Sequence, residues 1–217
     1  MRKYITINEK QLSRIIFESI HTLIKEWNGI EEVSDENDLA REAIKKGFKY
    51  IAYHNSREEK LTNFYNRSAG IHFGSLKAAN DRGEQRDWDD DIRNWTNKYF
   101  LKVDNPLVIE KDFDWEMESF DDWSSPEDDV YFDDINPFAY LANELGFDIE
   151  GKEIDEIINE HGYDCIIYRN QREDVGNYSI AMFNPNHIKL AEQTYDNNNN
   201  PIPLEQRFNT NTNDVRY

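Results

Sequence analysis

The chain has 217 residues, a length typical of one domain with appendages and a substantial core. It carries 44 Asp and Glu residues against 25 Lys and Arg residues, which gives a formal net charge of −19 at pH 7. Charge of this sign repels nucleic-acid phosphates, so direct binding of DNA or RNA is not expected. No run of about 18 apolar residues occurs, and no segment is therefore expected to span a membrane.

The cysteine and histidine content predicts neither a disulfide nor a metal site. The one cysteine, Cys165, excludes an intrachain disulfide and a thiol cluster, and the five histidines lack a ligand spacing such as His-x-x-x-His. Cys165 precedes Ile166 and Ile167 in an apolar run, which is typical of a small buried hydrophobic residue rather than a nucleophile.

Residues 1–30 are expected to form a separate unit, an amphipathic helix with a linker. Apolar residues recur there at spacings of three and four, as on one face of a helix: Leu12, Ile15, Ile16, Ile20, Leu23, Ile24 and Trp27. Polar residues interrupt the stripe too often for a secretory signal. Two interpretations remain open: the helix packs on its own domain, or it docks on an assembly partner. Asn28 to Asn37 then leads to a second helix, predicted over Asp38 to Lys46.

Two short segments after this helix have the layout of a ligand-binding cleft. Tyr50 to His54 is a β-prone run, and Gly70 to Gly74 is a second short strand whose glycines let a ligand approach the backbone. Ser75 is placed to cap a following helix, whose first amide groups would be free donors. Alternation along the strands predicts that the rings of His54 and His72 face one cleft.

A third segment supplies two more strands. Gly162 to Asn170 predicts a tight turn followed by a buried strand, and Tyr178 to Phe183 predicts another. The polar loop Gln171 to Asn177 joins them, as a hairpin or a split pair. The turn Asn184 to Asn186 and the run His187 to Leu190 then close the segment.

In order and spacing these segments resemble the His-Tyr-Glu branch of the ADP-ribosyltransferase superfamily. Residues 53–56 match its strand-borne His-Gly-Ser/Thr motif, and residues 70–80 match Gly-Ile-Tyr-Phe followed by Ser-Ala-Asn. Residues 179–189 match the last strand, where the poly(ADP-ribose) polymerases carry Glu-Tyr-Ile-Val-Tyr.

The chain is most similar to the ADP-ribosyltransferase-like domains of phage polyvalent proteins, over residues 48–217. Residues 101–107 resemble their middle strand, and the tail from Tyr195 to Tyr217 resembles their ending. The resemblance implies an α+β fold with a split antiparallel sheet around an NAD cleft. We expect this domain over residues 31–195, followed by an extended arm, ordered only where it lies on a partner or on the domain, over residues 196–217.

The resemblance also implies a reaction with NAD as substrate. The bond from nicotinamide to ribose breaks through an oxocarbenium-like transition state, so the enzyme must hold the nicotinamide and stabilise positive charge on the ribose. By position, His54 takes the family role of binding the adenosine ribose, and the backbone at Asn55 clamps the nicotinamide amide. The residues implied to contact NAD are His54, Asn55, Ser56, Gly70, His72, Phe73 and Asn170.

Two positions depart from the family pattern. His72 replaces the family tyrosine beside the nicotinamide, and Ser179 stands where the polymerases carry the glutamate that stabilises the developing cation. Ser179 agrees with the phage subgroup but supplies no negative charge. Either Glu173 or Asp174, in the loop before that strand, reaches into the site, or both are solvated loop residues. The implied catalytic set is His54, His72, Glu173 and Ser179.

Residues 110–134 form an acidic segment with twelve carboxylates and one basic residue, interleaved with aromatic side chains. We interpret it as a solvated insertion whose aromatics attach it to the domain. A surface that docks a basic partner, or that mimics nucleic acid, is the alternative.

The preferred function is mono-ADP-ribosyl transfer from NAD to a protein of the host, or NAD cleavage, in a phage particle or in the cytoplasm of a bacterial host. A second hypothesis is a catalytically silent copy of the fold that serves as a virion or cargo protein, with the N-terminal helix contacting an assembly partner. A third is an acidic inhibitor that imitates nucleic acid. The acceptor protein is not predicted, since the loops that would select it match no known pattern.

Overall fold

The computed structural model describes residues 29–59, 61–65, 69–86, 94–113, 145–147 and 152–217. The protein is α+β, with two four-stranded, mostly antiparallel sheets, as expected for the fold class. The predicted N-terminal helix and most of the acidic segment lie outside the described residues. No helix within the described ranges is long and apolar enough to cross a membrane.

The first sheet has the strand order β1-β2-β4-β8, and all its pairs are antiparallel. Its strands are β1 (Glu31–Glu32), β2 (Tyr50–Ser56), β4 (Trp95–Leu101) and β8 (Ile188–Leu190). The second sheet has the order β3-β7-β6-β5, with β5 and β6 parallel and the other pairs antiparallel. Its strands are β3 (Ile71–Phe73), β7 (Tyr178–Met182), β6 (Cys165–Asn170) and β5 (Pro106–Phe113).

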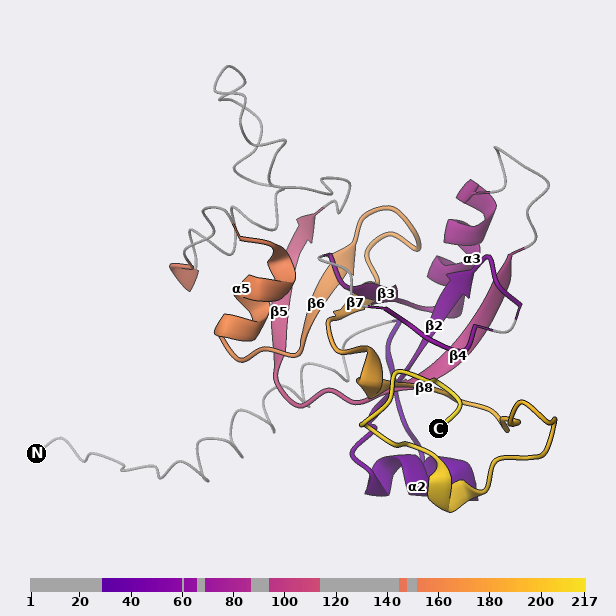
Figure 1. Ribbon diagram of the computed structural model, residues 1–217. Helices are drawn as coiled ribbons and strands as arrows, with labels where there is room; N and C mark the ends of the chain where they lie inside the picture. Colours follow the sequence, from indigo (N-terminus) through magenta and orange to yellow (C-terminus); the bar gives the residue numbers. More distant parts are fainter. Residues whose placement is uncertain (1–28, 60, 66–68, 87–93, 114–144, 148–151) are drawn as a thin grey trace, which may run out of the picture.

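The main core lies between the two sheets. Tyr50 and Ala52 of β2 pack with Phe73 of β3 and Ile180 of β7 in one buried cluster. Alternate residues of these strands point the other way and are covered by other elements. On the second sheet, Ile166 packs against α5 (Ile154–Glu160), the helix before β6. Figure 1 shows α5 beside β5 and β6.

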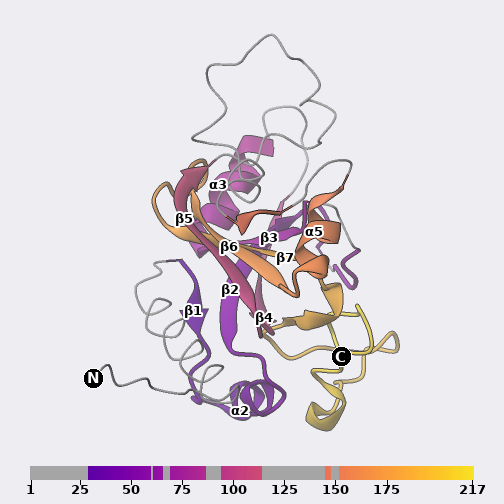
Figure 2. The same ribbon diagram turned by 90° about the vertical axis from the view of Figure 1, so that its left-hand side faces the viewer.

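The outer face of the first sheet is covered by α2 (Asp38–Lys45) and by the C-terminal arm. Ile51 and Phe100 pack there with Ala43 of α2 and with Phe208 of the arm. Figure 2 shows α2 and the C-terminal segment at one end of the molecule and α3 (Leu76–Arg86) towards the other.

The two helix starts that the sequence predicts are confirmed. The side chain of Asn37 accepts the backbone N–H of Ala40 at 2.9 Å at the start of α2. Ser75 accepts the backbone N–H of Ala78 at 2.9 Å at the start of α3. Both contacts satisfy an amide group that the first turn of a helix leaves without a partner.

Three expectations about boundaries change. Residues 101–107 do not form one strand, because β4 ends at Leu101 and β5 begins only at Pro106. The acidic segment does not begin as an insertion, because residues 110–113 belong to β5. The folded part starts before residue 31, since Ile30 is 5% exposed in the main core.

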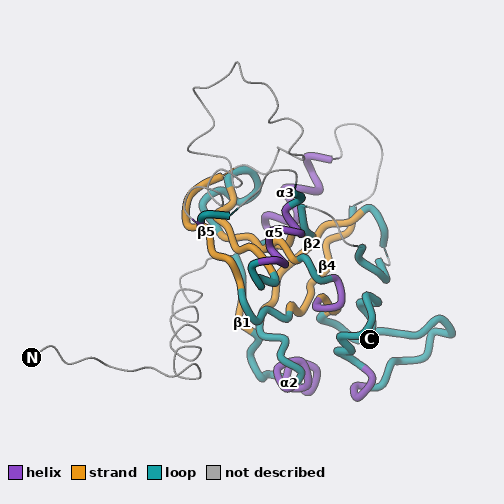
Figure 3. Tube along the Cα trace, turned by 60° about the vertical axis from the view of Figure 1, so that its left-hand side comes forward, coloured by secondary structure: helices purple, strands orange, loops and turns teal. Residues whose placement is uncertain are grey.

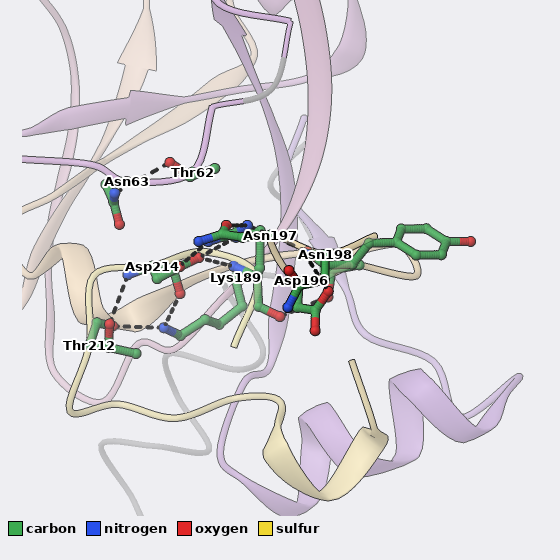
Figure 4. A network of polar contacts seen from close by, with 11 residues as sticks. Thr62, Asn63, Lys189, Asp196, Asn197, Asn198, Thr212 and Asp214 are labelled. Carbon is green, nitrogen blue, oxygen red and sulfur yellow. Dashed lines mark hydrogen bonds and ion pairs between the residues drawn. The ribbon is translucent and has the colours of Figure 1, made fainter. Parts of the chain in front are cut away.

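The C-terminal arm lies on the domain along much of its length, although Figure 3 shows that it is mostly loop. The backbone N–H of Val215 donates to the Thr62 carbonyl at 2.8 Å, and its side chain is fully buried in the main core. The ammonium of Lys189 in β8 donates to the carbonyls of Thr212 and Asp214 at 2.8 and 2.9 Å (Figure 4). These contacts make the arm part of the folded domain.

Candidate functional site

The three segments singled out in the sequence meet where the two sheets join. Tyr53 of β2 and Gly74 exchange backbone hydrogen bonds of 2.8 and 3.0 Å. Directly before Gly74, β3 runs antiparallel to β7, with His72 opposite Ala181. The first two segments and the last strand therefore lie side by side, as Figure 1 shows for β2, β3 and β7.

The rings of His54 and His72 lie on opposite faces of β3. His54 packs on Phe64 and Phe73, with ring centroids 5.1 and 5.3 Å away, on the side of the main core. His72 points to the other face, where it contacts Tyr168. The expectation that both rings face one cleft is therefore wrong. The strands alternate as predicted, but β2 and β3 belong to different sheets, so alternation within each strand does not relate the two faces.

The two histidines are instead joined through the backbone. His54 Nδ1 lies 2.7 Å from the carbonyl oxygen of His72, an oxygen that can only accept. Nδ1 therefore donates the hydrogen. This contact fixes the ring of His54 against the strand that carries His72.

The ring of His72 is held at both nitrogens. Nε2 lies 3.0 Å from the carbonyl oxygen of Ala69, and Nδ1 lies 2.8 Å from the hydroxyl of Tyr168. Because the carbonyl only accepts, Nε2 carries the hydrogen, and in the neutral ring Nδ1 accepts from Tyr168. The contact with Ala69 thus fixes a hydrogen on Nε2 of His72, while Nδ1 can either accept from the Tyr168 hydroxyl or donate to it.

Tyr168 of β6 extends this chain of polar groups from β3 across the second sheet. Burial raises the pKa of its phenol, the charge of Glu173 adds to the rise, and a hydrogen bond from the Ser179 side chain opposes it. Ser179, 3% exposed, in turn accepts from the Asn170 amide at 3.0 Å. Tyr168, Asn170 and Ser179 share one face of the sheet because β6 and β7 pair with Tyr168 opposite Ser179.

The loop acid Glu173 joins the same chain of groups. Asn170 donates one amide hydrogen to Ser179 and reaches the Glu173 carboxylate at 3.2 Å with the same nitrogen. Arg82 of α3 pairs with the other carboxylate oxygen at 3.4 Å. The Glu173 side chain is only 15% exposed, so its negative charge is held in partly desolvated surroundings.

The neighbouring acid Asp174 fastens the loop to the start of α3. It accepts hydrogen bonds from Ser75 at 2.6 Å and from Asn177 at 2.8 Å. Burial by itself would raise the pKa of Asp174, but these two hydrogen bonds and the charge of Lys77 lower it. Asp174 has a φ of 54°, a left-handed conformation that costs a non-glycine residue free energy. The contacts with α3 hold the turn that directs Glu173 inwards.

Other residues expected to contact NAD have structural partners. Asn55 donates to Thr96 Oγ1 at 3.1 Å, and Ser56 donates to the Glu58 carbonyl at 2.7 Å. Phe73 is 2% exposed in the main core, so only its backbone can contact a ligand without repacking. Gly70 has a φ of 80°, and a Cβ there would lie 3.1 Å from Ala181. Glycine is thus required at that turn by the close approach of β7.

The structure therefore brings together His72, Asn170, Glu173 and Ser179, and it attaches His54 through the carbonyl of His72. Sequence reasoning missed Tyr168 and Arg82. Tyr168 follows Ile166 by two residues in a predicted strand. This spacing places the two side chains on the same face of the sheet, and it could have identified Tyr168. Arg82 gives no such signal, since its contact with Glu173 spans 91 residues.

Groups of three or more His, Cys, Asp or Glu side chains with the geometry of a metal site are absent from the described ranges. Cys165 is fully buried, as its apolar neighbours predict, and burial raises the pKa of its thiol. Comparison of the chain with protein-family models, with curated proteins and with solved structures finds no match.

Proposed function

We propose that the protein binds NAD beside His72 and Glu173 and transfers a single ADP-ribose to an acceptor protein, or cleaves NAD. The observation that carries this proposal is the amide of Asn170, which contacts both the Glu173 carboxylate and the Ser179 hydroxyl. Glu173 therefore lies beside Ser179, the position at which ADP-ribosyltransferases of the His-Tyr-Glu branch carry their glutamate. Its charge would replace the one that Ser179 lacks.

In the proposed reaction the bond between the nicotinamide nitrogen and ribose C1′ breaks. The electron pair leaves with nicotinamide, and a nucleophilic atom of the acceptor bonds to C1′ and loses its proton. Water in place of the acceptor gives NAD cleavage. Positive charge develops on the ribose in the transition state, and a partly desolvated carboxylate stabilises it more strongly than a solvated one.

A neutral ring at His72 would suit the proposed NAD site. The nicotinamide ring of NAD is positively charged before the bond breaks, and a protonated imidazole beside it would weaken binding. With Tyr168 as the donor to Nδ1 and Ala69 as the acceptor from Nε2, the ring of His72 is neutral and can stack without that repulsion.

Substitution of Glu173 tests the function. Labelled NAD is incubated with the protein and a bacterial lysate, and transferred label and released nicotinamide are measured. Glu173→Gln should lower turnover about a hundred- to a thousandfold while NAD still binds, because one positioned charge is typically worth about 2.7 to 4 kcal/mol of barrier. Glu84→Gln, a change at an exposed acid of the same helix as Arg82, is the matched control and should retain the parent rate. Parent-like turnover by Glu173→Gln would exclude Glu173 from the reaction.

Placing a glutamate at position 179 is not expected to rescue Glu173→Gln. Ser179 is 3% exposed, and its hydroxyl lies 2.9 Å from the point that a Cβ on Gly74 would occupy. A longer acidic side chain has no room there and would bury a second carboxylate near Glu173. We expect Ser179→Glu to destabilise the fold by about 3 kcal/mol or more.

A catalytically silent protein with this fold is the second candidate, and one observation favours it. Both nitrogens of His72 and both oxygens of Glu173 already have partners within the chain. Such a set of mutually satisfied groups also stabilises a structural protein. NAD that neither binds nor turns over in the labelling experiment would support this candidate.

The acidic segment on which a nucleic-acid mimic would depend lies mostly outside the described residues.

A further inference from the structure

A second candidate site lies at the other end of the molecule from α3. A cavity of about 520 Å³ forms where the C-terminal arm crosses the end of α2 and the turn after β4. Lys46, Lys102 and Tyr217 line it together with arm residues 205–211. This volume falls in the range of about 300 to 1,000 Å³ that is typical of sites for small molecules.

The charges around this cavity oppose those of the chain as a whole. Lys46, Lys102 and Arg207 line it together with one side-chain carboxylate, that of Glu205, and Lys102 also pairs with Asp104 outside the lining at 3.8 Å. The full sequence has a net charge of −19. An excess of cations at one concave place in such a chain would attract an anion there and repel it elsewhere.

Arg207 is a buried cation that forms no ion pair with a carboxylate of the described residues. It is 2% exposed, its guanidinium donates to the backbone carbonyls of Glu192 and Leu190 at 2.9 and 2.7 Å, and it lies 5.3 Å from the centroid of the Phe208 ring. Its Nε is buried and forms no hydrogen bond. Burial lowers the pKa of Arg207 to about 10, even though the charge of Glu192 opposes this. A buried charge that lacks a counterion costs free energy, and a bound anion would offset that cost.

A second buried cation adds to the field. Lys189 is fully buried, and two backbone carbonyls, not a carboxylate, accept its hydrogens (Figure 4). The pKa of Lys189 is lowered to about 8, chiefly by burial; the charge of Asp214 opposes this change and the nearby charge of Arg207 adds to it. Two buried cations thus lie near each other beneath the arm.

We propose that this cavity binds a small molecule with phosphate groups, about the size of a nucleotide. Lys46 and Lys102 would contact the phosphates from the rim, and Arg207 would stabilise them from below. The amide and hydroxyl side chains of Asn209, Thr210 and Asn211 provide further donors for phosphate oxygens. Tyr217 presents an aromatic ring for a base or another flat group.

Inorganic pyrophosphate is the probe, and its binding is measured by calorimetry and by the rise in melting temperature of the full chain. The parent should bind it, and the double variant Lys46→Glu with Lys102→Glu should bind it roughly a hundredfold more weakly, since each charge-assisted contact is worth about a factor of ten. Lys45→Glu, at the neighbouring lysine of α2, is the matched control and should bind like the parent. If the double variant does not fold, Lys46→Gln with Lys102→Gln removes the charges without adding repulsion.

Three results would overturn the proposal: no pyrophosphate binding by the parent, equal binding by the parent and the lysine variants, or an equal loss with Lys45→Glu. The test is independent of the proposed NAD reaction. A protein that binds pyrophosphate through Lys46 and Lys102 but does not turn over NAD would retain this site and lose the other function.

Discussion

The hydroxyl of Ser75 donates a hydrogen bond of 2.6 Å to the carboxylate of Asp174, 99 residues farther along the chain. The same oxygen accepts the backbone N–H of Ala78 and so begins α3. One side chain therefore starts a helix and fastens the loop that carries Glu173. The position of the proposed catalytic acid depends on this contact.

Ser75→Ala should lower the free energy of unfolding by about 1 to 2 kcal/mol, because it removes a helix cap and a hydrogen bond to a charged group. Denaturant unfolding measures the loss. Hydrogen exchange should also speed up at the loop amides of residues 173–177. Ser75→Thr keeps the hydroxyl and serves as the control. Unchanged loop exchange in Ser75→Ala would show that Asp174 is held by its other contacts.

Tyr168→Phe should leave Nδ1 of His72 without its donor and cost about 1 to 3 kcal/mol of stability. Nitrogen NMR of the parent should show the neutral ring of His72 with its hydrogen on Nε2, and the Nδ1 signal should move in the variant. Tyr163→Phe, at a half-buried tyrosine that packs beside Phe147, is the control and should leave the His72 signals in place. A charged His72 ring in the parent at neutral pH would show that Nδ1 donates to the Tyr168 hydroxyl instead of accepting from it.

From the lowered pKa of Lys189 we predict that the free energy of unfolding rises at alkaline pH. Its pKa is about 8 in the folded protein against 10.5 for an ordinary lysine, so between these values the unfolded chain binds more protons. The free energy of unfolding should therefore increase as pH rises through this window, by up to about 3 kcal/mol. Lys189→Met should remove the increase, whereas Lys98→Met, at a side chain 40% exposed, should keep it. Parallel pH profiles for the parent and Lys189→Met would mean that Lys189 stays protonated throughout.

Val215 tests whether the C-terminal arm belongs to the fold. Val215→Ala removes two methyl groups from a fully buried site and should cost about 1 to 2.5 kcal/mol. Val175→Ala is the same chemical change at a side chain 65% exposed, and it should be within about 0.5 kcal/mol of neutral. Equal melting temperatures of the two variants would show that the packing of Val215 in the core does not stabilise the fold.

Local patterns in the sequence predicted the elements well. Alternation predicted β2, apolar runs bounded by turn residues predicted β6 and β7, and the cap Ser75 predicted the start of α3. These signals depend on neighbours in the chain, where propensity and capping act directly. The turn at residues 102–105 was missed because residues 101–107 were assigned to one strand by resemblance to the family's middle strand.

Relations between distant segments were harder to predict. Alternation fixed the face of each histidine within its own strand but not the angle between two strands of different sheets, so His54 and His72 were placed together wrongly. The loop acids were recognised as candidates, yet only the contact with Asn170 distinguishes Glu173 from Asp174. The arm was expected to be extended because its amide-rich sequence shows no periodicity, and single residues such as Val215 carry no pattern.

The way the arm enters the core also constrains how the chain folds during synthesis. Val215 hydrogen-bonds the Thr62 carbonyl, and its own carbonyl accepts the backbone N–H of Leu190 in β8. The ribosome makes β2 and β4 before Val215 emerges, so a nascent chain cannot complete this interior until Val215 has left the ribosome. Contacts of such long sequence separation slow folding and leave apolar surface exposed in the meantime. The apolar faces of β2 and β4 would therefore stay exposed on the nascent chain until Val215 emerges.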